Sequence, residues 1–314
     1  MGSSAAVPIR VGTAGWSYED WKGIVYPSRA PSGFDPLAFL ASLFDTNEIN
    51  STFYRIPAVQ TTRSWAGRVA HNPRFAFTAK LFRGFTHERT AAFPEERDFL
   101  AAMEPLSSEG RLAEVLVQFP VSFRNTEENR DSLASILDRF RALPLAAEFR
   151  HASWDREDAR DLLAIRGAVF VNIDQPWIGE NLRATDRVAP GRAYYRFHGR
   201  NAPKWFGPDT SNEERYNYLY TPSQIEKAAA RVEAAAREAA RGARGAAGTS
   251  GVAAIFNNHF RGQAVANAIQ LQHVLTGELV AVPETLRAAY PALAGITEEA
   301  AAGAASSRQP KLFG

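Results

Sequence analysis

The amino-acid sequence predicts an α/β fold, a single TIM-like (β/α)8 barrel with a flexible C-terminal tail. Eight short β-like stretches recur along the chain, a helix-compatible segment follows each stretch, and nearly every stretch ends in a polar or charged residue. Eight such units close a parallel barrel, and the site of such a barrel lies where its strands end. The stretches are residues 9–15, 47–53, 75–80, 115–118, 146–150, 169–174, 194–198 and 252–257.

Length and composition favour one domain. A chain of 314 residues could form one large barrel or two ordinary domains. The composition does not change before the tail, so we expect a barrel at residues 8–295 and a flexible linker with a terminal peptide at residues 296–314. A hydrophobic content of 45% with 22% charged residues is typical of a soluble globular protein. Cysteine is absent, which excludes disulfides, thiolate nucleophiles and cysteine-ligated zinc.

Neither a secretory signal nor a membrane segment is evident in the sequence. Residues 1–8 lack the basic and apolar regions of a signal peptide, and no apolar run approaches membrane-spanning length. We therefore expect a cytoplasmic protein without a membrane partner. The net charge of +2 is too small to argue for a polyanionic partner. Arginine outnumbers lysine, but the arginines are spread along the chain, which favours genome composition over a phosphate-binding surface as the explanation.

Helix signals follow several of the predicted strands. Asp35 precedes Pro36, a pattern typical of an N-cap with proline at the first helical position. Residues 126–143 and 263–275 carry apolar side chains at helical spacing. Thr221 opens an alanine-rich helix that we expect to run to about residue 241, before a glycine-rich loop.

Two connections are longer than a simple βα loop requires. Residues 16–32 include Trp16, and residues 199–221 include Trp205 and Tyr218. Long ordered loops in compact domains are usually functional. Both emerge on the mouth side of the predicted barrel, so their aromatic rings could form a lid or a wall on which a substrate stacks. The alternative is that these rings only plug the top of the barrel.

The alternation of side chains along each strand predicts which of them face the lumen. Inward residues of a barrel meet the lumen, and outward residues meet the helices. The charged residues share one parity and their neighbours are mostly apolar, so we expect the charged set to face inward. Glu48 and Glu148 would then pair with Arg150 and Arg196, as buried charges require. The pairs of equal parity are Glu48 with Asn50, Glu148 with Arg150, Asn172 with Asp174, and Arg196 with His198.

The strand-end residues form one candidate site. Glu48, Glu148 and His198 are the candidate catalytic acids and bases, and His198 is expected to titrate near neutral pH. The alternative is that the glutamates and arginines only hold the barrel together. The candidates for substrate binding are Trp16, Asn50, Tyr54, Lys80, Gln118, Arg150, Asp174, Arg196, Trp205, Tyr218 and Asn257.

A metal site is a weaker prediction. His87, His151, His198 and Glu148 could supply one mononuclear site of histidine and carboxylate ligands. No two histidines lie at close metal-ligand spacing. The sequence also contains no glycine-rich phosphate loop and no Gly-x-Ser-x-Gly nucleophile elbow.

Ordered motifs from residue 10 to about residue 276 resemble the DUF72 family, also called YecE-like proteins. The motifs are residues 12–18, 48–54, 77–80, 118–120, 148–151, 196–200 and 256–258. The resemblance implies a TIM-like barrel and no settled reaction. The barrel is also distantly similar to the endonuclease IV and sugar isomerase group of metal-dependent barrels. This chain offers too few ligands for a trinuclear zinc cluster, so that similarity implies at most one or two divalent metal ions.

The last residues are a separate signal. Gln309, Leu312 and Phe313 follow an alanine-, glycine- and serine-rich stretch that has the composition of a flexible linker. The pattern is similar to the short peptide with which replication and repair proteins bind the bacterial sliding clamp, so the clamp is a predicted partner. The alternative is that Leu312 and Phe313 pack back on the barrel.

Three functional hypotheses follow. The first is a hydrolase, with or without metal assistance, that acts on a phosphate-bearing substrate related to nucleic acid. The second is an isomerase, lyase or hydrolase for a small sugar-like or carboxylate molecule. The third is a non-catalytic binding module whose lumenal charges are structural. A closed pocket under residues 199–221 would favour a small ligand, and an open basic groove would favour a polymer.

Overall fold

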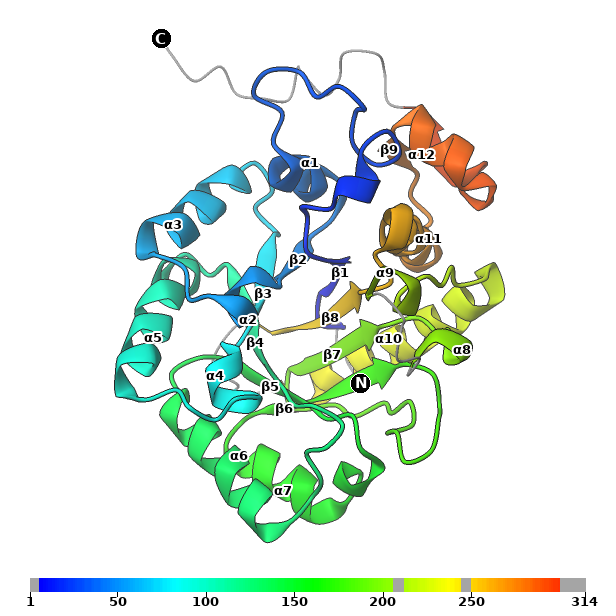
Figure 1. Ribbon diagram of the computed structural model, residues 1–314. Coiled ribbons are helices and arrows are strands. Elements are labelled where there is room, and N and C mark those ends of the chain that lie inside the picture. Colours follow the sequence, from blue (N-terminus) through cyan, green and yellow to red (C-terminus); the bar gives the residue numbers. More distant parts are fainter. Residues whose placement is uncertain (1–5, 206–211, 244–249, 300–314) are drawn as a thin grey trace.

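The computed structural model describes residues 6–205, 212–243 and 250–299. Its centre is a closed barrel of parallel strands in the order β1 to β8, with helices around it (Figure 1), and the predicted TIM-like fold is confirmed. The strands are β1 (Ile9–Ala14), β2 (Thr46–Ile49), β3 (Ala76–Lys80), β4 (Leu112–Gln118), β5 (Leu145–Glu148), β6 (Val169–Asp174), β7 (Arg192–Phe197) and β8 (Gly251–Phe256).

The helices form the outer layer in Figure 1. The longer ones are α1 (Pro36–Leu43), α3 (Val59–Arg68), α5 (Phe93–Ser108), α6 (Glu127–Arg139), α7 (Glu157–Ile165), α10 (Pro222–Gly242) and α11 (Gln263–Thr276). The shorter ones are α2 (Ser51–Tyr54), α4 (Arg83–Thr86), α8 (Ala202–Trp205), α9 (Asn212–Arg215) and α12 (Glu284–Ala289), with 3-10 turns η1 (Glu19–Trp21), η2 (Ala152–Trp154), η3 (Phe260–Gly262) and η4 (Pro291–Leu293).

Capping residues fix where two of these helices begin. The Asp35 carboxylate accepts hydrogen bonds from the backbone amides of Leu37 and Ala38, as the sequence predicts for an N-cap. Thr221 and Gln224 form a reciprocal capping box at the start of α10. Each cap satisfies amides that have no partner inside the helix, so the strand-to-helix connection ends at a defined residue.

The second strand is shorter than the sequence predicts. β2 ends at Ile49, and the predicted strand residues 50–53 instead begin a turn that continues as α2. Asn50 has a right-handed helical backbone, and the Thr52 hydroxyl donates to the carbonyls of Ile49 and Lys80. These bonds hold α2 across the end of β3 and bring the Phe53 ring over Lys80.

The strand register corrects one predicted inward pair. Residues aligned across parallel strands share a face, and Val171 aligns with Tyr194 while Ile173 aligns with Arg196. Val171 and Ile173 therefore face the lumen, and Asn172 and Asp174 face outward. The outward positions have polar partners of their own, because the side chain of Asn172 bonds the backbone of Arg187.

A row of stacked aromatic rings between the strands and the helices holds two loops at the mouth of the barrel. The rings of Phe119, Phe123, Trp154 and Phe149 stack in succession, with centroid separations of 3.9, 5.1 and 4.2 Å. The Trp154 indole also donates to the Phe123 carbonyl at 2.7 Å. Stacking of this kind adds to the energy of area burial. It fixes the connections after β4 and β5 against each other.

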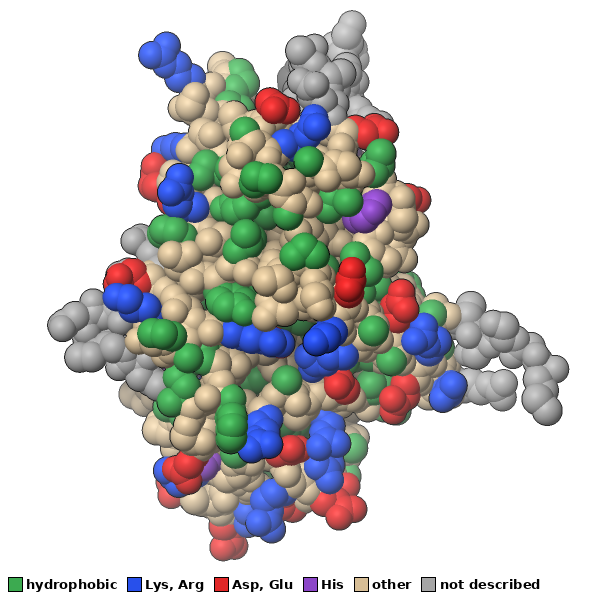
Figure 2. Space-filling view, turned by 90° about the vertical axis from the view of Figure 1, so that its right-hand side faces the viewer, with side chains coloured by type: hydrophobic (Ala, Val, Ile, Leu, Met, Phe, Trp, Pro, Cys, Tyr) green, Lys and Arg blue, Asp and Glu red, His purple; other side chains and the backbone are tan. Residues whose placement is uncertain are grey.

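Several charged side chains of the outer layer form ion pairs. Arg68 with Asp35, Arg139 with Glu96, and Arg166 with Asp138 form ion pairs at 2.9 Å or less. Acidic and basic side chains lie close to one another on the face shown in Figure 2. Such mixing agrees with the small net charge of the chain and gives that face no uniformly basic patch.

Regular secondary structure continues past residue 295, where the sequence predicted that the barrel domain ends. β9 (Val280–Val282) and β10 (Thr297–Glu299) form a small parallel sheet outside the barrel, which the sequence did not predict. Residues 300–314, and with them Gln309, Leu312 and Phe313, lie outside the described residues, so clamp binding stays a prediction. Among the helices of the described ranges, none is long and apolar enough to cross a membrane.

Candidate functional site

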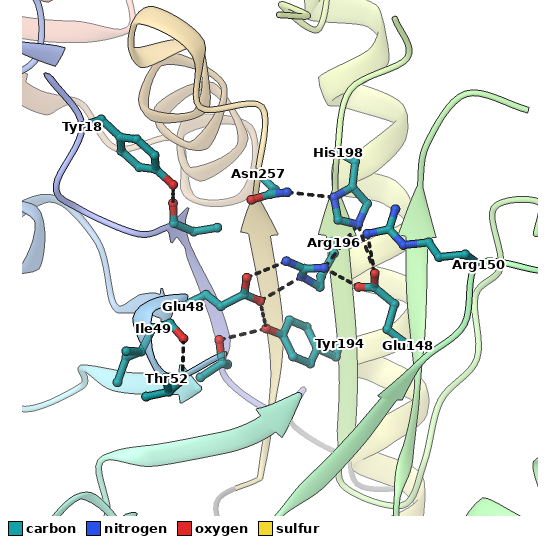
Figure 3. A network of polar contacts seen from close by, with 12 residues as sticks. Tyr18, Glu48, Ile49, Thr52, Glu148, Arg150, Tyr194, Arg196, His198 and Asn257 are labelled. Atoms are coloured by element: carbon teal, nitrogen blue, oxygen red, sulfur yellow. Dashed lines mark hydrogen bonds and ion pairs between the residues drawn. The ribbon is translucent and has the colours of Figure 1, made fainter. Parts of the chain in front are cut away.

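A buried arginine joins two glutamates at the mouth of the barrel. The Arg196 guanidinium donates to both oxygens of Glu48, at 2.8 and 2.6 Å, and to Glu148 at 2.5 Å. Figure 3 shows Arg196 between the two carboxylates. All three side chains are at most 1% exposed. A charge at this depth is costly unless it is paired, and here each one is. The lumenal pairing predicted from strand parity is present.

The pairing is supported from deeper in the lumen. Tyr194 precedes Arg196 by one inward position, and its hydroxyl donates to Glu48 at 2.5 Å beside the hydroxyl of Thr78 at 2.8 Å. Burial and the Glu48 charge raise the pKa of Tyr194 well above its ordinary value. The hydroxyl therefore stays protonated and continues to donate to the carboxylate.

Glu148 is held as a carboxylate. Burial opposes its ionisation, but Arg150 and Arg196 outweigh burial, and the pKa of Glu148 lies well below its ordinary value. Its Oε1 atom lies 2.6 Å from a terminal nitrogen of Arg150 and 3.6 Å from Nε2 of His198. A carboxylate with so low a pKa is a weak base, so Glu148 supplies negative charge more readily than it accepts a proton.

His198 does not titrate near neutral pH, contrary to the sequence prediction. Burial first, and then Arg150 and Arg196, lower the pKa of His198 to about 3. The amide nitrogen of Asn257 lies 3.0 Å from Nδ1. That amide donates to Nδ1, so Nε2 carries the hydrogen of the neutral ring, 3.6 Å from Glu148 and 3.4 Å from a terminal nitrogen of Arg196. His198 is then a neutral, oriented hydrogen-bond donor.

Lys80 is a basic group of the mouth whose pKa is lowered toward neutrality. It ends β3 and is half-buried, with its Nζ 4.3 Å from the centroid of the Phe53 ring. Burial, followed by the Arg196 charge, lowers the pKa of Lys80 to about 8. Its Nζ makes no hydrogen bond and no ion pair with any described residue. Lys80 therefore loses its proton more readily than an ordinary lysine.

A cavity of about 190 Å³ opens beside this network. Gln118 and Arg150 line it from the strand ends, and Trp205, Arg215 and Tyr216 line it from the connection between β7 and α10. The remaining lining residues are Val121, Gln175 and Asn181. A larger hollow of about 420 Å³, lined by residues such as Arg124, His151 and Glu180, adjoins it through Val121 and Asn181. We call the smaller one the mouth cavity, because it touches Arg150 of the buried network.

The described part of the β7–α10 connection, residues 199–205 and 212–221, covers the mouth, and we call it the roof segment. The rings of Trp205 and Tyr216 lie 6.5 and 6.3 Å from that of His198. The segment begins at Gly199, whose φ of +86° favours glycine. A Cβ atom at this position would lie only 2.7 Å from Cβ of Tyr218, so a larger residue would clash. Trp205 and Tyr216 of this connection therefore lie over His198, and whether their rings stack on a substrate or only plug the barrel stays a prediction.

The family model for "Protein of unknown function DUF72" matches residues 10–290. The chain belongs to the DUF72 family. It is 27% identical to the UPF0759 protein YunF of Bacillus subtilis (strain 168) over 285 residues, which cover 85% of this chain and 94% of that protein. The resemblance seen in the sequence motifs is confirmed, and the family description assigns no reaction.

Solved structures of other DUF72 proteins have the same fold. A DUF72 family protein from Thermotoga maritima MSB8 matches with a TM-score of 0.71 and 33% identity, over 85% of this chain and 99% of that one. One from Enterococcus faecalis V583 matches with a TM-score of 0.71 and 28% identity, over 85% of this chain and 95% of that one.

The side chain of Asp174, the last residue of β6, points away from the barrel lumen of this DUF72 protein and holds the roof segment. Its carboxylate accepts from Arg200 at 2.7 and 2.6 Å and from the Tyr220 hydroxyl at 3.0 Å. The same hydroxyl accepts the backbone amide of Gly199 at 2.9 Å. Asp174 therefore anchors the segment that covers the site and does not line the lumen.

The other predicted substrate-binding residues divide between the site and its surroundings. Gln118, Arg150 and Trp205 line the mouth cavity. Tyr54 is 62% exposed, Trp16 packs edge-on against Trp65, and Tyr218 bonds Gln224 of α10. The sequence interpretation missed Gln175, Asn181, Arg215 and Tyr216 as lining residues. Tyr194 shares the parity of Arg196 and His198, so its place in the network could have been predicted.

The predicted metal ligands do not gather. His87 is exposed and bonds Thr86, and His151 bonds Ser153 and faces Glu180. Only His198 and Glu148 of the four candidates lie together. Across the described ranges, no group of three or more histidine and carboxylate side chains is arranged to hold a metal ion. The donor set predicted from the sequence therefore does not fit a mononuclear site.

Proposed function

We propose that this DUF72 protein is an enzyme for a small molecule that bears a phosphate or carboxylate group. The substrate binds in the mouth cavity, and the reaction is an isomerisation or a lyase reaction. The observation that carries the proposal is a cavity lined by two guanidinium groups, Arg150 and Arg215, beside a buried charged network at the strand ends. Sites of TIM barrels lie at this end.

The charges around the cavity favour an anion. Glu48 and Glu148 supply negative charge, while Arg150, Arg196 and Arg215 supply positive charge, to which Lys80 adds only when it is protonated. His198 is neutral and does not alter the balance. A surplus of positive charge in a partly desolvated site attracts a phosphate or a carboxylate, and guanidinium groups match both in geometry.

The size of the cavity favours a small molecule. Its volume of about 190 Å³ is below the roughly 300–1,000 Å³ typical of sites for drug-sized ligands. The aromatic rings of Trp205 and Tyr216 cover it, and each presents an apolar surface to a carbon skeleton. A short sugar phosphate or hydroxy acid suits this combination of rings and guanidinium groups.

Hydrolysis of a phosphate ester, including one in nucleic acid, is the second candidate. Arg150 and Arg215 would hold its phosphate as readily as that of a metabolite. Binding of a polymer needs a long basic path over the surface. Exposed arginines such as Arg124 are instead paired with carboxylates, and the face in Figure 2 mixes both signs of charge. A small phosphorylated or carboxylated molecule therefore remains the better supported substrate.

Calorimetric titration tests the proposal with four probes: glycerol 3-phosphate, glycerol, inorganic phosphate and a short oligonucleotide. We expect glycerol 3-phosphate to bind at least ten-fold more tightly than glycerol. Arg215→Gln should weaken its binding about ten-fold, whereas Arg97→Gln, at an exposed arginine outside the site, should leave it unchanged. Equal affinity for glycerol and its phosphate would overturn the proposal, and tighter binding of the oligonucleotide would favour the phosphodiester substrate.

A further inference from the structure

Lys80 differs from the other described lysines. Lys22 pairs with Glu19 at 2.7 Å, Lys204 pairs with Glu214 at 3.2 Å, and Lys227 is exposed on α10. Lys80 alone lies at a strand end of the barrel mouth. The full chain contains one more lysine, Lys311, outside the described residues. So few lysines make any selective reaction at one of them easy to locate.

The fold holds the Lys80 amine in place without giving it a carboxylate partner. The turn into α2 brings the Phe53 ring 4.3 Å from Nζ, and the backbone carbonyl of Lys80 accepts the Thr52 hydroxyl at 2.7 Å. Both nearby glutamates are already occupied by Arg196. Burial and the Arg196 charge disfavour the ammonium form, and an amine is nucleophilic only when it is neutral.

Strand register places this amine beside the mouth cavity. Lys80 aligns with Leu116 of β4, and Gln118, the next inward residue of that strand, lines the cavity. The charge of Lys80 also interacts with those of Arg150 and Glu148, and Arg150 lines the cavity as well. Lys80 itself does not line the cavity and lies one inward position deeper than Gln118, so a ligand held by Arg150 and Arg215 would reach the amine by extending its carbon skeleton past Gln118.

We propose that Lys80 is a catalytic residue that forms an imine with an aldehyde or ketone carbon of the anionic substrate. This inference rests on the proposed function and narrows the substrate class to anionic carbonyl compounds. The Nζ lone pair forms a C–N bond while the carbonyl oxygen takes up a proton. The C–O bond of that carbinolamine then breaks and the oxygen leaves as water. With one proton taken up overall, the product is a protonated imine.

The surroundings suit that cation. Glu48 and Glu148 lie near enough to interact with the charge on Lys80, so their carboxylates stabilise the positive charge of the imine. A protonated imine draws electrons from the adjacent carbon, which makes loss of a proton there, or cleavage of the next C–C bond, easier. These are steps of isomerases and lyases, and they require no metal ion and no oxidant.

Reductive trapping tests the inference. The full-length protein is incubated with D-glyceraldehyde 3-phosphate and cyanoborohydride, and peptide mass spectrometry locates the reduced adduct. We expect at least ten-fold more adduct at Lys80 than at Lys22, Lys204 or Lys227, and a rise in its rate around pH 8. Neutral D-glyceraldehyde should label Lys80 at least ten-fold more slowly, because it lacks the group that Arg150 and Arg215 hold.

Matched variants separate reaction from folding. Lys80→Arg keeps the positive charge and cannot form an imine, so it should lose the adduct while its melting temperature shows that it is folded. Lys227→Arg should retain the full adduct. Glycerol 3-phosphate binding without an adduct at Lys80 would overturn this inference and leave the proposed function standing. If the protein neither binds glycerol 3-phosphate nor forms an adduct at Lys80, both the proposed function and this inference are wrong. Equal labelling of all lysines would show that Lys80 is an ordinary amine.

Discussion

Strand β7 carries an inward arginine near each end of the barrel, and the two make different sites. At the N-terminal end, Arg192 bonds both oxygens of Glu114, at 3.2 and 3.0 Å, and the backbone carbonyl of Gly167. At the mouth, Arg196 bonds both Glu48 and Glu148. Both ion pairs join an arginine on the same face of one strand to glutamate, although Arg192 is only partly buried while Arg196 is fully buried.

The difference between them lies in what surrounds the pair. Glu114 faces one guanidinium, and burial raises its pKa to about 7 although Arg192 opposes the shift. Glu148 faces two guanidinium groups, Arg150 and Arg196, and its pKa is lowered well below the ordinary value. The mouth thus has more positive than negative side chains and a cavity beside them. Neither of the two cavities is lined by Arg192 or Glu114. A buried ion pair alone is therefore weak evidence of function.

Removing Arg196 should produce the largest effect. Arg196→Gln leaves Glu48 and Glu148 buried without their shared partner, and we expect the free energy of unfolding to fall by about 4 kcal/mol. Urea unfolding followed by circular dichroism measures this loss. Arg97→Gln is the control, because Arg97 is 67% exposed, and we expect it to change stability by less than about 0.5 kcal/mol. A loss below about 1 kcal/mol for Arg196→Gln would show that the mouth pairs do not hold the barrel together.

Glu114 should make stability depend on pH in the opposite sense from an ordinary paired carboxylate. Its folded-state pKa of about 7 lies above the ordinary value of 4.5. Below pH 4.5 both states are protonated and Glu114 has no effect. Between pH 4.5 and 7 the unfolded chain ionises first, so the free energy of unfolding falls as pH rises, by up to about 3 kcal/mol.

Comparison with Glu114→Gln isolates that contribution. The stability of the native protein minus that of the variant should fall from pH 4.5 to pH 7 and then level off. Chemical unfolding at half-unit steps of pH gives both curves. A difference that rises with pH would mean that Arg192 lowers the pKa of Glu114, and the two ends of β7 would then behave alike.

Tyr194→Phe should have an intermediate effect, confined to the mouth. The change removes one hydrogen bond to a buried carboxylate, and such bonds contribute about 2 kcal/mol. We expect that loss in the free energy of unfolding, with no change in the pH dependence assigned to Glu114. The matched change Tyr195→Phe, at an outward residue that bonds Asp186, should cost less because Asp186 is partly exposed. If both variants lose the same unfolding free energy, the hydrogen bond of Tyr194 inside the lumen is no stronger than that of Tyr195 near the surface.

The strands and the buried pairs were predictable because they depend on local alternation. Glu48, Glu148, Arg150 and Arg196 alternate with mostly apolar neighbours, and the register turns Glu48, Glu148 and Arg196 toward the lumen. The outward orientation of Asn172 and Asp174 was not predictable in this way. The residue pattern of β6 does not show which of its two faces points into the lumen. The groups that bond the outward side chains of Asn172 and Asp174 belong to Arg187 and Tyr220, which lie in later connections of the chain.

Protonation states and the cavity depended on the closed barrel. The low pKa of His198 results from burial beside Arg150, which follows β5, and that of Lys80 results from burial beside Arg196. Arg215 and Tyr216 lie in a connection without regular periodicity, so nothing in the sequence separated these lining residues from Tyr218, which bonds a helix instead. Periodicity predicts faces of strands, and it cannot predict which loop residues bend back over them.

Asp174→Asn should have the smallest effect on stability and distinguishes the two interpretations of this residue. Arg200 is 44% exposed, so loss of its charged partner should cost less than about 1 kcal/mol of unfolding free energy. The roof segment should loosen, and the Gly199 amide, which donates to Tyr220 beside Asp174, should exchange its hydrogen about ten-fold faster. Weaker binding of glycerol 3-phosphate should accompany this exchange, because the rings of Trp205 and Tyr216 are held less firmly over the cavity. Mass-spectrometric hydrogen exchange and calorimetry measure the two effects on one preparation. If binding weakens while Gly199 keeps its protection, Asp174 contacts the ligand as the sequence predicted, and its assignment to the roof segment is wrong.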